Sequence, residues 1–175
     1  MSCGELRSVI SIFDSADTTA LFAIVALAHL TFAIPLSYID IREHRLPNKL
    51  TLAITGAVAC TAAVTALMIP TVEKRVLGAC AIAVVVGALV FVFALLSPGS
   101  IGMGDAKVTP ATVVLAGLGG IPVLLGALAW ICGAGALAAF WVLVRTRSTK
   151  ARFAFGPIIL SAPYGGLGLA LLGLF

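Results

Sequence analysis

The chain has 175 residues, of which 61% are hydrophobic and only 10% are charged. A soluble domain is about 45–50% apolar and about 25% charged, so this composition excludes an ordinary soluble protein. The mean hydropathy of +1.18 points the same way. The net charge is +4, but in a membrane protein the placement of the basic residues matters more than their sum. We therefore expect one all-α domain over residues 1–175, a polytopic membrane bundle of about six transmembrane helices in contact with a lipid bilayer.

The chain begins with a polar segment of mixed charge, residues 1–18. It lacks the basic start, short apolar core and small-residue cleavage site of a signal peptide. The first apolar span follows at 19–40 and contains His29, for which a packing or hydrogen-bonding role is favoured over a ligand role. His29 precedes Asp40 by about three helical turns, so both residues share a helix face. A polar loop at 41–49 ends this region.

Five further spans are predicted after this loop, at 50–69, 76–96, 106–118, 122–144 and 155 to the C-terminus. The fourth span of the six is short, because Gly119-Gly120-Ile121-Pro122 divides a long uncharged stretch. Its helix would be about 20 Å long, which is less than the hydrocarbon thickness of a bilayer. Small residues recur in the last two spans and predict close helix packing. They are Gly126, Gly133, Gly135, Gly165, Gly166 and Gly168.

The cysteines are far apart and form no C-x-x-C pair, which argues against a zinc site. Three of them lie inside apolar runs, where we expect small core residues. These three are Cys60, Cys80 and Cys132. We expect neither a metal nor a cofactor, and no nucleic-acid partner.

The basic residues predict the orientation, because basic loops stay in the cytoplasm. Eight of them fall in loops on one side: Arg42, Arg45, Lys49, Lys107, Arg145, Arg147, Lys150 and Arg152. The other side holds only Arg7, Lys74 and Arg75. Asp40 ends a helix that arrives at the basic side, and Asp105 begins one that leaves it. Both carboxyl groups are therefore expected at the same depth, facing the cytoplasm.

The stretch Ile101-Gly102-Met103-Gly104-Asp105-Ala106-Lys107 contains the only acidic residue after residue 73. An acid at the edge of an apolar segment is a candidate functional residue. Paired with Asp40, Asp105 could hydrolyse a peptide bond: one carboxylate takes a proton from water while the other carboxyl protonates the carbonyl oxygen. Because two close carboxylates cannot both ionise easily, one pKa must rise. Helix dipoles favour Asp105 as the initial base and Asp40 as the protonated acid.

Simpler roles are open for each of these residues. Asp105 could cap the fourth helix. Asp40 could be solvated at the membrane surface, or it could pair with Arg42 or Arg45. Lys107 could extend its amine to the membrane interface, or it could steady a charged pair of aspartates. The combination of two acids at one depth favours the functional interpretation.

These motifs resemble those of the type IV prepilin peptidases and the related archaeal preflagellin peptidases. Gly102-Met103-Gly104-Asp105-Ala106-Lys107 fits the G-x-G-D motif of that family, including its following x-K. Asp40, followed seven residues later by Pro47-Asn48, fits the earlier aspartate motif, and Phe155-Gly156-Pro157 resembles a further family element. The resemblance covers nearly the whole chain after residue 18.

By that resemblance, Asp40 and Asp105 would be the catalytic pair, and Gly102, Gly104 and Lys107 would be substrate-binding residues. The substrates would be prepilin-like membrane precursors of type IV pili or related secretion systems, cut at the cytoplasmic membrane face after a short basic leader. Many bacterial relatives also carry an N-terminal region with paired cysteines that methylates the product. This chain shows no such region, so we expect peptidase activity without methylation.

Two other functions remain open from the sequence. An ion- or proton-coupled transporter would also use membrane-embedded acids and glycine-broken helices, but near the middle of the bilayer. A non-catalytic membrane subunit of a secretion or pilus system would need neither aspartate. Replacement of either acid by alanine would leave the function of such a subunit intact.

Overall fold

The computed structural model describes residues 15–43, 46–97, 102–147 and 154–175, which are helical with short connections and contain no strand. Most of the predicted polar N-terminal segment, and loop residues such as Arg45, Lys150 and Arg152, fall outside these ranges. The described helices are α2 (Ala16–Glu43), α3 (Asn48–Met68), the short 3-10 helix η1 (Pro70–Val72), α4 (Glu73–Leu96), α5 (Met103–Leu118), α6 (Ile121–Thr146) and α7 (Gly156–Leu171).

The six α-helices of the described chain follow the six predicted spans, which confirms an all-α membrane bundle. Four segments are long and apolar enough to cross a membrane: α2, α3, η1 with α4, and α6. The helices α5 and α7 have 16 residues each and are shorter. The predicted shortness of the fourth span is therefore confirmed, and the last span is shorter than expected.

Helix boundaries near the two acids differ from the prediction by about one turn. α2 continues to Glu43, so Asp40 lies inside its last turn. α5 begins at Met103, so Asp105 lies in its first turn and does not precede it. The predicted break at Gly119-Gly120 is present, and Gly120 has φ +90°, a backbone conformation that favours glycine.

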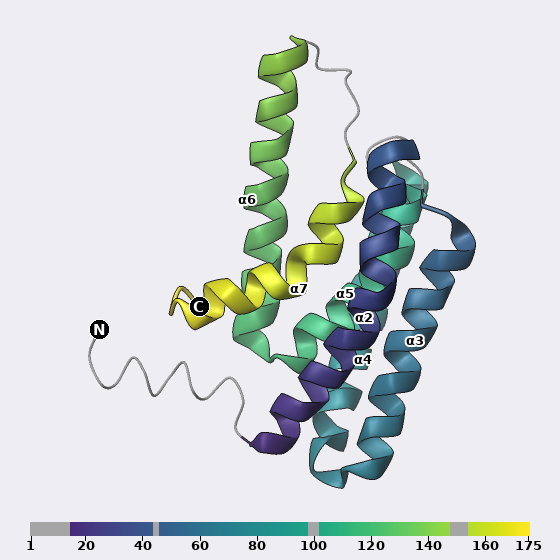
Figure 1. Ribbon diagram of the computed structural model, residues 1–175, viewed down its shortest axis with the longest axis vertical. Coiled ribbons are helices and arrows are strands. Elements are labelled where there is room, and N and C mark those ends of the chain that lie inside the picture. Colours follow the sequence, from purple (N-terminus) through teal and green to yellow (C-terminus); the bar gives the residue numbers. More distant parts are fainter. Residues whose placement is uncertain (1–14, 44–45, 98–101, 148–153) are drawn as a thin grey trace.

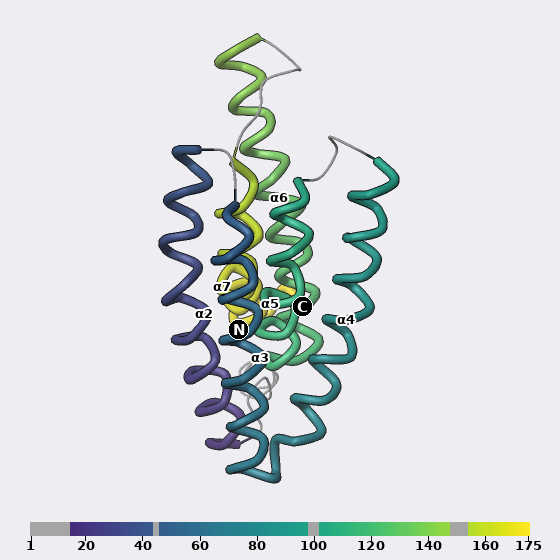
Figure 2. Tube along the Cα trace, turned by 90° about the vertical axis from the view of Figure 1, so that its right-hand side faces the viewer, coloured from purple at the N-terminus to yellow at the C-terminus, as the bar shows by residue number. Residues whose placement is uncertain are grey.

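The short helix α5 is the centre of the bundle. It contacts each of the other five described α-helices. Figure 1 shows α6 and α7 on one side of the molecule and α2, α3 and α4 on the other, and Figure 2 shows α2 and α4 on opposite sides of α5. The side chains of Val108, Leu115 and Leu118 are fully buried there. α5 is therefore mostly buried from Ala106 onward by its neighbours, while its first three residues, at one end of the bundle, are exposed or partly buried.

α6 and α7 pack closely through glycine, as predicted. A Cβ atom added to Gly126 would lie 2.6 Å from the backbone oxygen of Gly166. Gly135 is likewise pressed against Phe155, so these glycines allow the two segments to approach. For Gly133 and Gly168 the prediction was wrong, because an added Cβ would meet nothing within 4 Å.

The expectation that the cysteines are core residues was wrong for two of the three. Cys60 and Cys132 are exposed on the surface of the bundle, and only Cys80 packs partly against the core. A membrane helix is apolar on its lipid side as well as on its packed side, so an apolar neighbourhood in the sequence does not distinguish the two.

Candidate active site

Four helix termini meet at one end of the bundle. The C-terminal end of α2 lies there with the N-terminal ends of α3, α5 and α7 (Figure 1). A cavity of about 310 Å³ opens among the first three of these termini. It is lined by Asp40, Leu46, Asn48, Gly102, Met103, Gly104 and Asp105. The two acids that the sequence paired are therefore walls of a single cavity, although 65 positions separate them.

Asp40 is buried, with 6% of its surface exposed. Its Oδ2 accepts a hydrogen bond of 2.9 Å from the backbone N–H of Gly156, the first residue of α7. The guanidinium group of Arg42 lies over the ring of Tyr38, and within the described residues Asp40 forms no ion pair. The alternatives of a solvated Asp40, or one paired with Arg42, are thus contradicted.

Asp105 is the third residue of α5, after Gly102 at the N-cap position. It lies outside the four segments that are long enough to span the membrane. Burial, and to a lesser extent the nearby Asp40, raise the pKa of Asp105 to about 6, although a backbone hydrogen bond from Gly102 opposes the rise. That bond from the N-cap residue resembles half of a capping box. Asp105 therefore caps α5, and the negative charge of Asp40 also disfavours its ionisation.

The glycines of the G-x-G-D segment provide space at the cavity. Gly102 has φ −65°, an ordinary value for any residue, so its backbone does not require glycine. A Cβ at Gly102 would lie 2.9 Å from Oδ2 of Asp105, and a Cβ at Gly104 would lie 2.7 Å from Cβ of Leu46. Larger residues at these two positions would therefore push on one acid and on the opposite cavity wall.

Lys107 contacts the cavity wall through Asn48. Its Nζ donates a hydrogen bond of 2.8 Å to Oδ1 of Asn48. The backbone oxygen of Lys107 also accepts a hydrogen bond of 3.3 Å from the Thr55 hydroxyl of α3. These two bonds join the first turns of α5 to α3. The amine of Lys107 is thus held beside the cavity, in contact with one of its lining residues.

The expected division of roles between the acids rested on helix dipoles, and the structure contradicts its premise. Asp40 is near the C-terminus of its own helix, but it also faces the N-terminus of α7, where N–H groups favour negative charge. Sequence reasoning missed this contact. The only available signal was the Phe155-Gly156-Pro157 motif, since glycine permits close approach and proline is common in the first turn of a helix.

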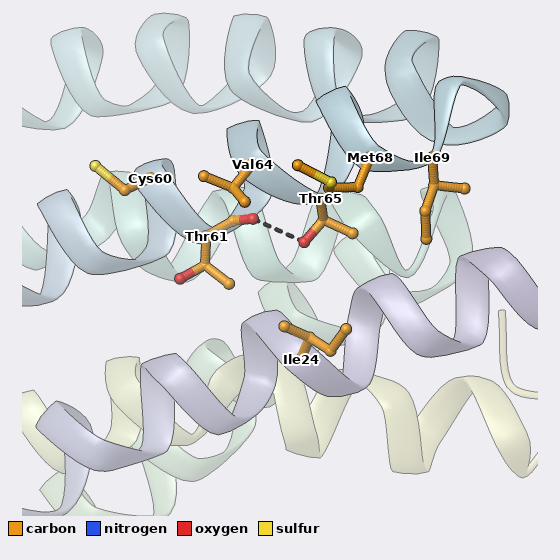
Figure 3. Close-up of a pocket in the computed structure, with 7 residues that line it drawn as sticks. All are labelled: Ile24, Cys60, Thr61, Val64, Thr65, Met68 and Ile69. Atoms are coloured by element: carbon orange, nitrogen blue, oxygen red, sulfur yellow. Dashed lines mark hydrogen bonds between the residues drawn. The ribbon is translucent and has the colours of Figure 1, made fainter.

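A larger cavity, of about 460 Å³, lies between α2 and α3 and away from the acids (Figure 3). Ile24 borders it from α2, and residues of α3 such as Cys60 and Val64 border it from the other side. The Thr65 hydroxyl in this cavity donates to the backbone oxygen of Thr61 in its own helix. The cavity is apolar and holds no acid, so the smaller cavity is the candidate active site.

Comparison with known proteins identifies one family. No curated protein and no solved structure was found to be significantly similar to the chain. The model of one protein family, described as the type IV leader peptidase family, matches residues 25–143. This range is more than half of the chain and includes both Asp40 and Asp105. The protein is accordingly a multi-pass membrane peptidase, and it belongs to the type IV leader peptidase family.

Proposed function

We propose that the protein is an aspartic endopeptidase that removes the short basic leader of prepilin-like membrane precursors, with Asp40 and Asp105 as the catalytic pair. One observation carries this proposal: both carboxyl groups line one cavity, and Asp40 contributes to the raised pKa of Asp105. Two acids that influence each other's ionisation can hold one proton between them, which is the requirement for aspartic peptidase chemistry.

The surroundings of the acids favour Asp40 as the base and Asp105 as the acid. Asp40 accepts the N–H of Gly156, a partner that suits a negative charge. Burial and the charge of Asp40 raise the pKa of Asp105 to about 6, which favours its protonated form. This assignment is the reverse of the one expected from the sequence.

The reaction then runs in two steps. Asp40 takes a proton from water, the water oxygen bonds to the peptide carbonyl carbon, and Asp105 gives its proton to the carbonyl oxygen. The resulting tetrahedral diol has both hydroxyl groups on the former carbonyl carbon. Asp40 next gives its proton to the leaving nitrogen as the carbon–nitrogen bond breaks. Asp105 recovers a proton from one hydroxyl, which leaves a carboxylic acid and a free amine.

The position of the cavity fits a substrate that is cut just outside its own membrane helix. The cavity lies at helix ends, where an extended leader can enter from water while the following apolar helix stays in lipid. Gly102 and Gly104 leave the substrate backbone room beside Asp105. Lys107, held by Asn48, completes the substrate-binding side of the cavity in this proposal.

The basic loops orient this end of the bundle toward the cytoplasm, since basic loops remain on that side of a membrane. Met103 lines the cavity and is 40% exposed, which makes it a reporter of access. In a cysteine-free variant, Met103→Cys should react with a membrane-impermeant thiol reagent only after the cytoplasmic side is opened. Labelling from the outside of intact cells would contradict this orientation.

Leader removal from a purified prepilin-like precursor, in lipid, tests the activity itself. The wild-type protein should shorten the precursor, and Asp40→Asn and Asp105→Asn should each lower the rate by about 10³-fold or more. Glu43→Gln is the matched control, because Glu43 is an exposed acid in the same helix turn as Asp40. Equal cleavage by the wild type and both aspartate variants would exclude the proposed mechanism.

A further inference from the structure

His29 is a buried polar residue for which the proposed reaction has no use. It lies in α2, and none of its surface is exposed. Its Nδ1 is 3.0 Å from the hydroxyl oxygen of Tyr164 in α7. The same hydroxyl donates a hydrogen bond of 3.1 Å to the backbone oxygen of Ala26, one helical turn before His29. This contact joins the two helices that also meet at Asp40 and Gly156.

The proton positions at this contact follow from its geometry. The single hydroxyl proton of Tyr164 is used in the bond to Ala26, so the Nδ1 proton of His29 is donated to the tyrosine oxygen. The other ring nitrogen, Nε2, is buried and has no hydrogen-bond partner among the described residues. A buried nitrogen without a partner destabilises the fold. The favourable polar contact of His29 is therefore the one that its Nδ1 makes with Tyr164.

The two polar contacts hold α7 against α2 at two levels. His29 and Asp40 are eleven residues apart in α2, about 16 Å, and Gly156 and Tyr164 are eight residues apart in α7, about 12 Å. The order of the contacts shows that the helices run in opposite directions. A shift of α7 by one residue would move Gly156 by about 1.5 Å along the axis, which is enough to break a hydrogen bond.

We propose that His29 and Tyr164 are positioning residues, which keep α7 in the register that presents the N–H of Gly156 to Asp40. The inference rests on the proposed function for its catalytic consequence, since Asp40 is the base in that mechanism. Neither residue is among those that line the cavity of the two acids. Their effect reaches the reaction only through the hydrogen bond at Gly156.

Two substitutions at the same position separate this role from general packing. The amide of asparagine can occupy the place of Nδ1, whereas the longer glutamine places its amide near Nε2. His29→Asn should therefore keep kcat within about twofold of the wild type, while His29→Gln should lower kcat about tenfold with little change in KM. Tyr164→Phe, which removes only the hydroxyl group, should behave like His29→Gln.

Equal kcat values for His29→Asn and His29→Gln would overturn the proposal, and so would an unchanged kcat in Tyr164→Phe. A rise in KM without a fall in kcat would also contradict it, because that result would place the defect in substrate binding. Tyr164→Phe is the gentlest of these changes, so it provides the decisive comparison should either His29 variant fail to fold.

Hydrogen exchange gives a measurement that does not depend on any substrate. Residue 157 is proline and has no amide proton. A short proteolytic fragment that ends at Pro157 therefore reports on the amide protons of Gly156 and of the one or two residues before it. Exchange at Gly156 should be faster by about fivefold or more in His29→Gln and Tyr164→Phe, but not in His29→Asn. Unchanged exchange in all three variants would overturn the inference. If the wild type cleaved no precursor, the proposed function would fail, and the exchange comparison would still decide the register question.

Discussion

The backbone N–H of Gly156 donates a hydrogen bond of 2.9 Å to Oδ2 of Asp40, across 116 positions of the chain. A Cβ atom at Gly156 would lie 2.6 Å from that oxygen, closer than a side chain can tolerate. The first residue of α7 is therefore both the donor to one proposed catalytic acid and a residue whose size limits the position of that acid. The candidate site thus includes a third segment of the chain, beyond the two that carry the acids.

Replacement of Gly156 by alanine should displace the carboxyl group of Asp40 and break its hydrogen bond. We expect kcat to fall by about 10²-fold or more, as for loss of a correctly placed general base. Gly168→Ala is the matched control in the same helix, because an added Cβ there meets nothing within 4 Å. Leader cleavage by the two purified variants checks this prediction, and a fully active Gly156→Ala would contradict it.

The pKa of Asp105 should respond to the charge of Asp40. In Asp40→Asn we expect the pKa of Asp105 to fall below its wild-type value of about 6, because the repulsion from Asp40 is removed. It should remain above 3.8, because burial is the larger cause of the shift. Carbon-13 NMR titration of labelled aspartate carboxyl groups measures this value.

Asp17→Asn is the control for that titration, since Asp17 lies at the other end of α2 and accepts a hydrogen bond from Thr71. It should leave the pKa of Asp105 unchanged. An Asp105 pKa that is the same in Asp40→Asn as in the wild type would mean that the two carboxyl groups do not interact.

The activity should decline as the pH rises through about 6. Asp105 must be protonated to act as the acid, and its raised pKa keeps it protonated below that pH and ionised above it. The alkaline limb of kcat/KM reports the free enzyme and should have its midpoint near 6. The limb of kcat should lie at higher pH, because a bound substrate excludes water from the carboxyl group. A rise of kcat/KM through the same pH range would instead assign the base to Asp105.

The contact between α6 and α7 should be sensitive to a single methyl group. Gly126→Ala would press a Cβ against the backbone of Gly166, and overpacking of this kind destabilises a protein by about 1–3 kcal/mol. Gly133→Ala in the same helix meets nothing within 4 Å and should leave the stability unchanged. Thermal unfolding in detergent compares the two. Equal melting temperatures of the two variants would contradict the prediction, because they would show that α6 and α7 can move apart without loss of stability.

Much of the fold was predictable because each helix corresponds to one apolar run in the sequence, bounded by polar residues or by glycine and proline. The short α5 and the break at Gly120 followed from the sequence for that reason. The placement of Asp40 and Asp105 at one end followed from counting spans and basic loops. These inferences need only the order of residues along the chain.

Contacts between helices were not predictable in the same way. Asp40 accepts its hydrogen bond from the first residue of α7, which lies 116 positions later. The partner of His29 is Tyr164, 135 positions away, although a hydrogen-bonding role for His29 was expected. The prediction that Cys60 and Cys132 are core residues failed for a related reason: both are exposed, and the lipid-facing and packed sides of a membrane helix have similar composition. Such features depend on which faces of the helices pack against each other, and a single sequence does not reveal that pairing.

The arrangement of Gly156 on Asp40 also has a consequence for biosynthesis. The ribosome makes both acids before it makes α7, so a growing chain can carry Asp40 and Asp105 into the bilayer while the donor to Asp40 does not yet exist. On the mechanism proposed above, such a half-finished chain lacks a properly held base. The order of translation would then delay activity, and the peptidase would begin to cleave its substrates only after α7 had been synthesised and inserted.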